Sequence, residues 1–303
     1  MTHCRVSLRP SSPVDLRLTL GVLGHGRANP SVRFGPGEMW RATRTPDGPA
    51  TTRVTAAAGR LTMQAWGPGA ACAAEGFPAL VGEHDHESGF APRDAVVADL
   101  RRRLRGLRLC RTGAVVEALV PAILEQKVIG LEARRSYAGL VRMRGEPAPG
   151  PGAGMGLMVP PEPSVLARTP SYVFHRLGVE RKRADTIRLA CSYARRLEEV
   201  VTMPLPDAYR RLTALPGIGP WTAAEVALVA LGDADAVSVG DYHLPNMVAW
   251  ALAGEARAGD DRMLELLEPY RGHRGRVIRL IEAGAPAPPR FGPRLPLNPI
   301  ASR

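Results

Sequence analysis

Residues 212–223 read Leu-Thr-Ala-Leu-Pro-Gly-Ile-Gly-Pro-Trp-Thr-Ala, a short turn with two glycines between two helical patterns. Gly217 and Gly219 permit a tight turn with positive φ and let the backbone come close to a ligand. Ile218 can fill the space between the two helices, and the following proline suits the first position of a helix. The N–H groups of the turn and of Thr222 point outward at a helix N-terminus, where phosphate binds readily. The pattern predicts a helix–hairpin–helix that holds one DNA strand without reading its sequence.

Positive charge is concentrated in the same part of the chain. The 303 residues carry a formal net charge of +11, and all basic residues are Arg except Lys127 and Lys182. Residues 1–92 hold 9 Arg against 7 acidic residues, a net of +2, whereas residues 93–303 hold 31 basic against 22 acidic residues, a net of +9. A polyanion, with nucleic acid first, is the partner expected of the second part. On charge alone, a solvated Arg-rich surface is an equal alternative.

Several classes of protein are not expected. No run of about 18 apolar residues predicts a transmembrane helix, and the first residues lack the apolar core of a secretory signal. The four cysteines are too far apart for a zinc knuckle or an iron–sulfur cluster. A reducing cytoplasmic setting, on the nucleoid of a bacterium, is therefore expected, without a metal site. The cysteines stand at Cys4, Cys72, Cys110 and Cys191.

The N-terminal part combines strand patterns with turn signals, whereas helical periodicity begins near residue 92. A Pro- and Gly-rich stretch at 146–163 predicts a loop. The fold class expected is an α+β N-terminal domain followed by a mostly α-helical body. The strand patterns are Val14–Thr19, Glu38–Thr45, Ala50–Thr55 and Gly59–Trp66. The domains expected are 1–92, the α+β accessory domain; 93–284, the helical body with two lobes; and 285–303, a Pro-rich tail.

An aspartate follows the hairpin at a fixed distance. Asp241 stands 20 residues after Trp221, within Val-Ser-Val-Gly-Asp-Tyr-His-Leu at 237–244. Such a residue caps the next helix, and the dipole at a helix N-terminus keeps it ionised. The hairpin followed by Asp241 resembles the helix–hairpin–helix DNA glycosylase superfamily, in which a catalytic Asp lies near the start of a helix at this distance. Capping alone is the simpler alternative, and one side chain can do both.

Three further segments resemble the AlkA-like 3-methyladenine DNA glycosylase branch of that superfamily, and the residues before 92 are similar to its accessory domain. Residues 120–128 resemble its ILxQ helix, residues 177–184 its GxxxxRA turn and residues 268–275 its Pro-aromatic-Arg segment. Bifunctional members form a Schiff base through a Lys just after the hairpin glycines, where this chain has Trp221. The resemblance therefore implies a monofunctional enzyme that removes the base and leaves an abasic site.

The resemblance also implies roles for individual residues. The damaged nucleotide leaves the duplex, and Asp241 stabilises an oxocarbenium-like sugar and activates water. The cationic base stacks on Trp221 and Tyr270, with packing in the core as the alternative for both rings. Glu225, one helical turn after Trp221, is a second candidate for the base pocket, or a solvated helix residue. It replaces an aromatic residue of the relatives, Lys127 replaces an apolar wedge, and Tyr270 replaces a frequent Trp. The residues expected to contact DNA are Gly217, Gly219, Thr222, Gln126, Lys127 and His243, with Gln126 and Lys127 as candidates for filling the gap in the duplex.

The expected partner is double-stranded DNA with a damaged base, bound by a monomer that does not associate with a membrane. No cofactor is expected, apart from a monovalent cation that the hairpin carbonyls of relatives can hold in the DNA complex. Two rival functions remain open. One is a non-catalytic helix–hairpin–helix protein that binds damaged DNA, and the other is a lyase acting on oxidised bases.

Overall fold

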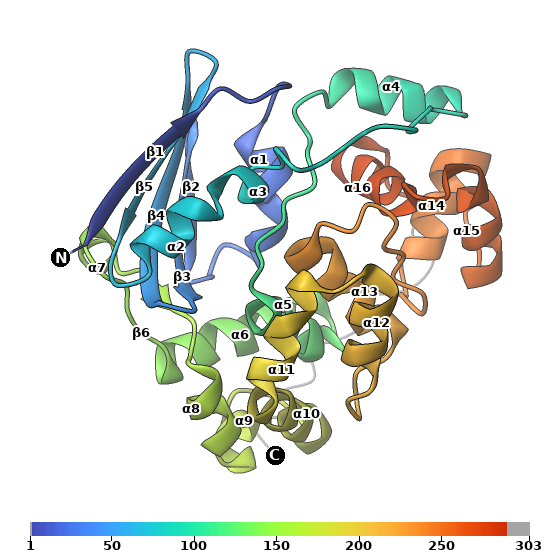
Figure 1. The fold of residues 1–303 in the computed structure, drawn as a ribbon. Coiled ribbons are helices and arrows are strands. Elements are labelled where there is room, and N and C mark those ends of the chain that lie inside the picture. The colour runs from blue at the N-terminus through green and yellow to red at the C-terminus, as the bar shows by residue number, and fades with distance from the viewer. Residues whose placement is uncertain (1, 290–303) are drawn as a thin grey trace.

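The structure, a computed structural model, describes residues 2–289. A five-stranded antiparallel sheet comes first and helices follow, as Figure 1 shows from blue to red. This confirms the expected α+β N-terminal part and helical body. Of the tail expected at 285–303, residues 290–303 lie outside the described residues. Within residues 2–289, no helix combines the length and the apolar character needed to cross a membrane.

The sheet has the strand order β1-β5-β4-β3-β2, and every neighbouring pair is antiparallel. The hairpin between β4 and β5 turns at Ala58 and Gly59, both with positive φ (49° and 68°), as a tight two-residue turn requires. The three strand patterns predicted between Glu38 and Trp66 are confirmed as β3, β4 and β5. The strands are β1 (His3–Leu8), β2 (Val32–Gly35), β3 (Glu38–Thr45), β4 (Gly48–Ala57) and β5 (Arg60–Trp66).

The strand predicted at Val14–Thr19 is wrong, because the structure has helix α1 (Leu16–Leu20) there. Asp15 accepts hydrogen bonds from the backbone N–H groups of Arg17 and Leu18 at 2.8 and 2.9 Å, which fixes the start of the helix. Helices α1, α2 (Ala70–Glu75) and α3 (Phe77–Leu80) cover one face of the sheet. Their apolar side chains form the N-terminal core with those of the strands.

The Pro- and Gly-rich stretch predicted as a loop at 146–163 is partly ordered. Strands β6 (Glu146–Pro147) and β7 (Met158–Val159) form a short antiparallel ribbon around the single-turn helix α7 (Pro151–Gly154). Leu157 and Val159 are buried there against Ala42 of β3. The composition indicates a loop, but contacts with the sheet hold this one in place.

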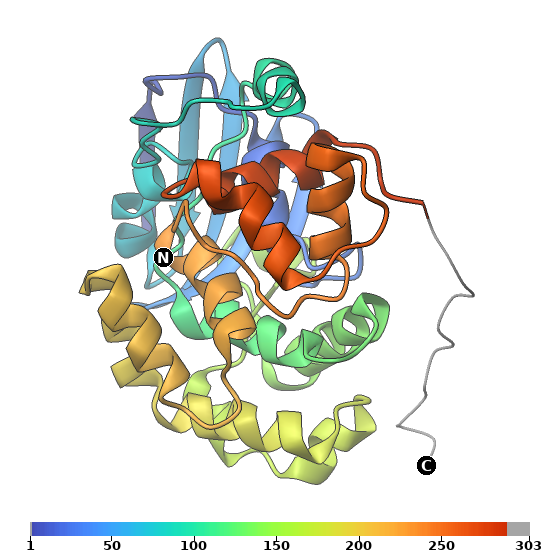
Figure 2. The same cartoon turned by 90° about the vertical axis from the view of Figure 1, so that its right-hand side faces the viewer.

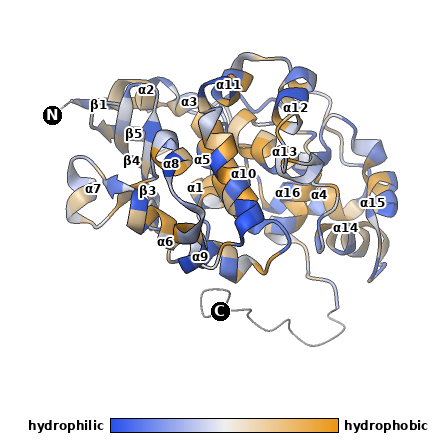
Figure 3. Cartoon of the chain, turned by 90° about the horizontal axis from the view of Figure 1, so that it is seen from below, coloured by the Kyte–Doolittle hydropathy of each residue, from blue (hydrophilic) through white to orange (hydrophobic). Residues whose placement is uncertain are grey.

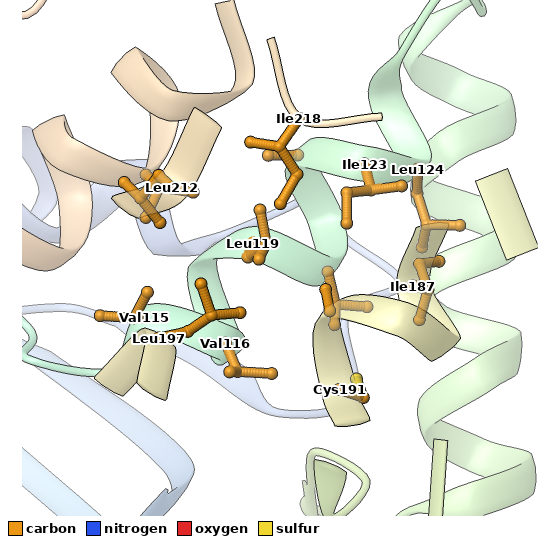
Figure 4. Close-up of a cluster of buried hydrophobic side chains, with 14 of the residues drawn as sticks. Val115, Val116, Leu119, Ile123, Leu124, Ile187, Cys191, Leu197, Leu212 and Ile218 are labelled. Carbon is orange, nitrogen blue, oxygen red and sulfur yellow. The ribbon is translucent and has the colours of Figure 1, made fainter. Parts of the chain in front are cut away.

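The first helical lobe is built around α5 (Val115–Glu125), which is mostly hydrophobic (Figure 3) and almost fully buried. Figure 4 shows side chains of α5, such as Leu119 and Ile123, packed with Ile187 and Ile218 from other helices. Glu198 caps α5 by accepting from the N–H groups of Val115 and Val116 at 2.9 Å each. The other helices of the lobe are α6 (Gly130–Arg144), α8 (Pro163–Arg168), α9 (Ser171–Arg176), α10 (Arg181–Ser192), α11 (Ala194–Glu198), α12 (Leu205–Thr213) and α13 (Pro220–Val226), which continues as a π-helical turn (Ala227–Leu231).

The second lobe joins segments far apart in the sequence. Helix α4 (Ala95–Arg103) packs with α14 (Leu244–Ala253), α15 (Asp260–Leu267) and α16 (Arg274–Gly284) around a separate core. In the turned view these C-terminal helices lie above the helices of the first lobe (Figure 2).

Two ion pairs, one partly buried and one fully buried, fix these parts relative to one another. Arg41 of β3 bonds Glu117 of α5 at 2.6 Å, which docks the sheet onto the first lobe. Arg276 of α16 bonds Asp85, which follows α3, through both terminal nitrogens at 2.9 and 2.5 Å, and both side chains are at most 3% exposed. These contacts link the sheet, the first lobe and the second lobe into one framework.

Candidate active site

The hairpin between α12 and α13 combines a packed and an open glycine. Gly217 has φ = 89°, and a Cβ placed on it would lie 2.4 Å from Oγ1 of Thr186 on α10. Gly219, just before α13, has an extended backbone (φ = −96°, ψ = −178°), and a Cβ there would meet no atom within 4 Å. Ile218 between them is buried in the core of the first lobe. Gly217 thus lets the hairpin pack closely against α10, whereas Gly219 leaves its backbone accessible to an approaching ligand.

Gln126 holds the hairpin against α5. Its Nε2 donates to the carbonyl of Gly217 and to Oγ1 of Thr222, both at 2.9 Å. Thr222 is only 2% exposed, so its side chain faces the protein. Of the residues expected to contact DNA, the structure therefore uses the side chains of Gln126 and Thr222 to build the hairpin. Lys127 is exposed at the break between α5 and α6, with a left-handed backbone (φ = 54°).

Two carbonyls of the hairpin turn accept hydrogen bonds within the protein, and the monovalent cation expected there in the DNA complex stays a prediction. The carbonyl of Gly217 accepts from Gln126, and that of Leu215 accepts the N–H of Ile218 at 3.1 Å. No step proposed below therefore uses a cation at this place.

Trp221 and Asp241 meet directly, although 20 residues separate them. The indole Nε1 of Trp221 donates to Oδ2 of Asp241 at 3.0 Å. Oδ1 of Asp241 accepts from the N–H groups of His243 and Leu244 at 2.7 and 2.8 Å, at the start of α14. Three donors thus fix the carboxylate at a helix N-terminus, where negative charge is favoured. The capping role foreseen for Asp241 is present, together with the contact to the aromatic residue at the hairpin.

A second carboxyl group lies one turn along α13. Glu225 accepts a short hydrogen bond from Oγ of Ser238, and the carbonyl of Ser238 accepts the N–H of Asp241 at 3.2 Å. Burial raises the pKa of Glu225 to about 7, with smaller contributions from the charges of Glu282, Glu125 and Asp241, while the Ser238 bond opposes the shift. Burial also raises the pKa of Glu125, at the end of α5, and the charge of Asp241 adds to this. The site therefore gathers three carboxyl groups that repel one another's charge.

Tyr270 is not brought to this site. It is 3% exposed in the core of the second lobe, with its ring centroid 6.3 Å from that of Phe90. Its hydroxyl accepts from the N–H groups of Arg93 and Asp94 at 3.0 and 2.9 Å and donates to the Asp94 carboxylate at 2.5 Å. These bonds fix the backbone just before the N-terminus of α4. The expectation that Tyr270 stacks on a base is therefore not supported, because its ring is packed inside the protein.

Tyr242 is a candidate that the sequence analysis did not single out. It directly follows Asp241 and is 78% exposed, and its ring meets that of the exposed His243 edge-on, with centroids 4.9 Å apart. An exposed aromatic residue beside a fixed carboxylate can stack on a base. The sequence feature that could have identified Tyr242 is its position in Asp-Tyr-His, directly after the candidate Asp241. His243 keeps its side chain at the surface, where it can reach a phosphate, and its backbone N–H holds Asp241.

The fold is that of the helix–hairpin–helix DNA glycosylases, as expected from the resemblance. The 3-methyladenine DNA glycosylase from Archaeoglobus fulgidus matches 91% of this chain and 97% of its own, with a TM-score of 0.77 and 18% identity. The 8-oxoguanine glycosylase/lyase of Clostridium acetobutylicum, in its apo form, matches 92% and 95%, with a TM-score of 0.70 and 12% identity.

A third structure matches a smaller part of the chain. The 3-methyladenine DNA glycosylase of Schizosaccharomyces pombe, in complex with abasic DNA, covers 67% of this chain and 97% of its own, with a TM-score of 0.52 and 16% identity. No protein-family model matches the sequence, and no curated protein is significantly similar to it.

Proposed function

We propose that this protein is a monofunctional DNA glycosylase that extrudes and removes alkylated, 3-methyladenine-like bases from double-stranded DNA. The observation that carries the proposal is the contact between the Trp221 indole and the Asp241 carboxylate beside the hairpin. It places an aromatic ring and a fixed negative charge together next to a backbone segment suited to hold phosphate. The fold shared with solved DNA glycosylases supports it.

DNA binding rests on the hairpin and on the charge of the chain after residue 92. The open backbone at Gly219 and the N-terminus of α13 can approach one strand without reading its sequence. Lys127 projects from the break after Gln126 and can contact a phosphate or fill the gap left by the extruded nucleotide. The net charge of +9 after residue 92 supplies the long-range attraction.

In the proposed reaction, Asp241 acts on the sugar. As the bond between the sugar and the base breaks, positive charge develops on the sugar ring, and a fixed carboxylate stabilises it without having to reorganise. The N–H groups that hold Oδ1 fix the direction of the carboxylate. The same group can orient the attacking water and accept its proton. The products are the free base and an abasic site.

The carboxyl groups around Asp241 favour a cationic base. N-alkylated purines carry positive charge on the base, and a cation is stabilised by an aromatic face and by nearby carboxylates. Trp221 supplies the face and Asp241 supplies the charge. Glu225, whose pKa is raised to about 7, would gain negative charge when a cationic base lies beside it. On this ground we propose alkylated bases, rather than neutral oxidised ones, as the substrates.

The absence of lyase activity follows from the side chain at the hairpin. A Schiff base requires an amine, and Trp221 occupies the position that carries Lys in bifunctional enzymes. We expect no covalent adduct when the protein is treated with borohydride on DNA containing 8-oxoguanine or an alkylated base. A trapped adduct would instead support a lyase, with Lys127 and Lys182, the two lysines of the chain, as the residues to test.

The central test replaces Asp241 by Asn and scores abasic sites on N-methylated duplex DNA. Asp241→Asn should lower the rate of base release by about 100-fold or more and leave the affinity for DNA within a few-fold. Asp261→Asn, an exposed aspartate in the first turn of α15, is the matched control and should behave as wild type. Full activity of Asp241→Asn would remove Asp241 from the mechanism. Failure of the wild type to release any alkylated base would favour a non-catalytic protein that binds damaged DNA.

A further inference from the structure

The turn that carries Asp241 is held by two carboxyl groups from other elements. The carbonyl of Ser238 accepts the N–H of Asp241 at 3.2 Å, which closes a β-turn. Gly240, the third residue of this turn, has φ = 92°, a value for which glycine is preferred at that position. Glu225 of α13 accepts the hydroxyl of Ser238, and Asp260 of α15 accepts the N–H of Gly240 at 3.0 Å. The position of Asp241 therefore depends on contacts at the first and the third residue of its turn.

Helix α13 makes two separate contacts with this segment. Trp221, in its first turn, donates through the indole Nε1 to Oδ2 of Asp241 at 3.0 Å. Glu225, four residues later and on the same face of the helix, bonds the hydroxyl of Ser238, which is 7% exposed. Because one helix makes both contacts, the bond between Glu225 and Ser238 fixes the carboxylate of Asp241 relative to the aromatic ring.

The carboxyl group of Glu225 does not serve the stability of the core at neutral pH. Burial raises its pKa to about 7, so ionisation of this group works against folding. An apolar side chain would fill the same place without that cost, but it would leave the hydroxyl of Ser238 without this partner. Groups with strongly shifted pKa values concentrate at functional sites. The carboxyl group thus matches a requirement of the turn rather than of the core.

We propose that Glu225 is a positioning residue, which holds Asp241 against the Trp221 indole through the hydroxyl of Ser238. The inference rests on the glycosylase function proposed above, in which Asp241 stabilises the charge that develops on the sugar. A displaced carboxylate stabilises that charge less well, because this form of catalysis depends on groups that are fixed in advance. Glu225 can bond the hydroxyl in either protonation state, as an acceptor when ionised and as a donor or acceptor when protonated.

The first test observes the Trp221 indole directly and needs no substrate. The chain has four tryptophans, and Trp221→Phe identifies the indole N–H signal of Trp221 in a proton–nitrogen correlation spectrum of the labelled protein. In Ser238→Ala and in Glu225→Leu this signal should move toward its position in Asp241→Ala, which lacks the acceptor. In Glu225→Gln it should stay at the wild-type position, since the amide oxygen still accepts the hydroxyl. A signal that moves in neither Ser238→Ala nor Glu225→Leu would overturn the inference.

The second test measures base release. Ser238→Ala should lower kcat on N-methylated duplex DNA about 10-fold. KM and the affinity for duplex DNA with an abasic-site analogue should stay within about 2-fold, because only the position of Asp241 changes. Ser192→Ala is the matched control and should behave as the wild type, since Ser192 is exposed at the end of α10 and its hydroxyl bonds the carbonyl of Leu189 in the same helix. An unchanged kcat of Ser238→Ala would overturn the inference.

A double variant separates positioning from folding. Glu225→Leu combined with Ser238→Ala removes both partners of the bond, and replacing both by apolar groups costs little stability. Its Tm should equal or exceed that of the wild type, while its kcat should be at least as low as that of Ser238→Ala. A kcat that falls only in proportion to the folded fraction would overturn the inference.

The spectrum also keeps the inference separate from the proposed function. If the wild type released no base, the proposed function would fail, and the Trp221 signal alone would then decide. A signal that Ser238→Ala and Glu225→Leu both move would support the role of Glu225 in holding Asp241, and an unmoved signal would refute it.

Discussion

The two glycines of the hairpin should respond in opposite ways to the same substitution. At Gly217 the backbone is left-handed, and a Cβ would lie 2.4 Å from Oγ1 and 2.8 Å from Cγ2 of Thr186. At Gly219 the backbone is extended and the space around a Cβ is empty. We predict that Gly217→Ala destabilises the protein and that Gly219→Ala does not, although both add one methyl group to the same turn.

The magnitude for Gly217→Ala combines three contributions. Alanine in the left-handed region costs about 1–2 kcal/mol, and forcing a carbon into a filled space costs about 1–3 kcal/mol. The lower entropy of alanine in the unfolded chain offsets about 0.4–1 kcal/mol. The free energy of unfolding should therefore fall by about 3 kcal/mol. For Gly219→Ala, the same entropy gain opposes the weaker capping by alanine before α13, so the change should stay within about 1 kcal/mol.

Thr186 provides a way to separate the contributions. Removing its Oγ1 and Cγ2 in Thr186→Ala eliminates the two closest contacts but leaves the backbone of Gly217 unchanged. In the double variant Gly217→Ala, Thr186→Ala, the packing contribution of about 1–3 kcal/mol should be recovered. The cost of about 1–2 kcal/mol for placing alanine in the left-handed region should remain.

Urea unfolding and thermal unfolding of the wild type and the four variants measure these changes, and abasic-site formation and duplex DNA affinity are measured on the folded proteins. Gly219→Ala should weaken DNA binding several-fold without loss of Tm, since its methyl group lies where DNA is proposed to approach. The reasoning is refuted if Gly217→Ala is as stable as the wild type, or if Thr186→Ala fails to recover any of its loss. Unchanged DNA affinity of Gly219→Ala would remove Gly219 from the DNA interface.

Three further predictions concern buried polar groups. Tyr270→Phe should lower the free energy of unfolding by about 1–3 kcal/mol, because it leaves the Asp94 carboxylate and the N–H groups of Arg93 and Asp94, just before α4, without their partner. Base release per folded molecule should stay unchanged, and an unaltered urea midpoint would contradict the prediction. Arg276→Met leaves Asp85 buried and unpaired and should cost about 3–5 kcal/mol, part of which the added change Asp85→Asn should restore in the same unfolding assay. The folded-state pKa of Glu225, about 7, exceeds its usual value of 4.5. Protonated Glu225 therefore contributes about 3 kcal/mol to the free energy of unfolding below pH 4.5, and this contribution is lost as the pH rises through 7. Between pH 5 and 8, Glu225→Gln should lose less stability than the wild type, and identical slopes of the free energy of unfolding against pH would refute the shift.

Local patterns predicted much of the fold. Alternation and turn residues located β3, β4 and β5, and helical periodicity located the body after residue 92. Strand β1 was missed and α1 was predicted as a strand. The pairing of β1 runs from His3 with Trp66 to Leu8 with Leu61, so its partners lie far away in the sequence. A short segment such as α1 carries too few residues for periodicity alone to separate helix from strand.

The sequence by itself determined the hairpin, because two glycines in one turn restrict the backbone regardless of the surroundings. It also predicted that Asp241 precedes a helix, and the resemblance to the helix–hairpin–helix DNA glycosylases implied that Trp221 stands where bifunctional members carry a lysine. Spacing alone could not show that the Trp221 indole and Asp241 touch, since this depends on the path of the chain between them.

Only the tertiary structure decided which candidates share a site. Tyr270 fits an aromatic site motif, but the structure buries its ring. The residues that contact it lie at 90–94, about 180 positions earlier in the sequence. The docking of the sheet onto α5 likewise brings His25 within 4.0 Å of Glu125, a contact that no local pattern predicts. Burial and partners arise from packing between distant segments, and a one-dimensional pattern does not contain them.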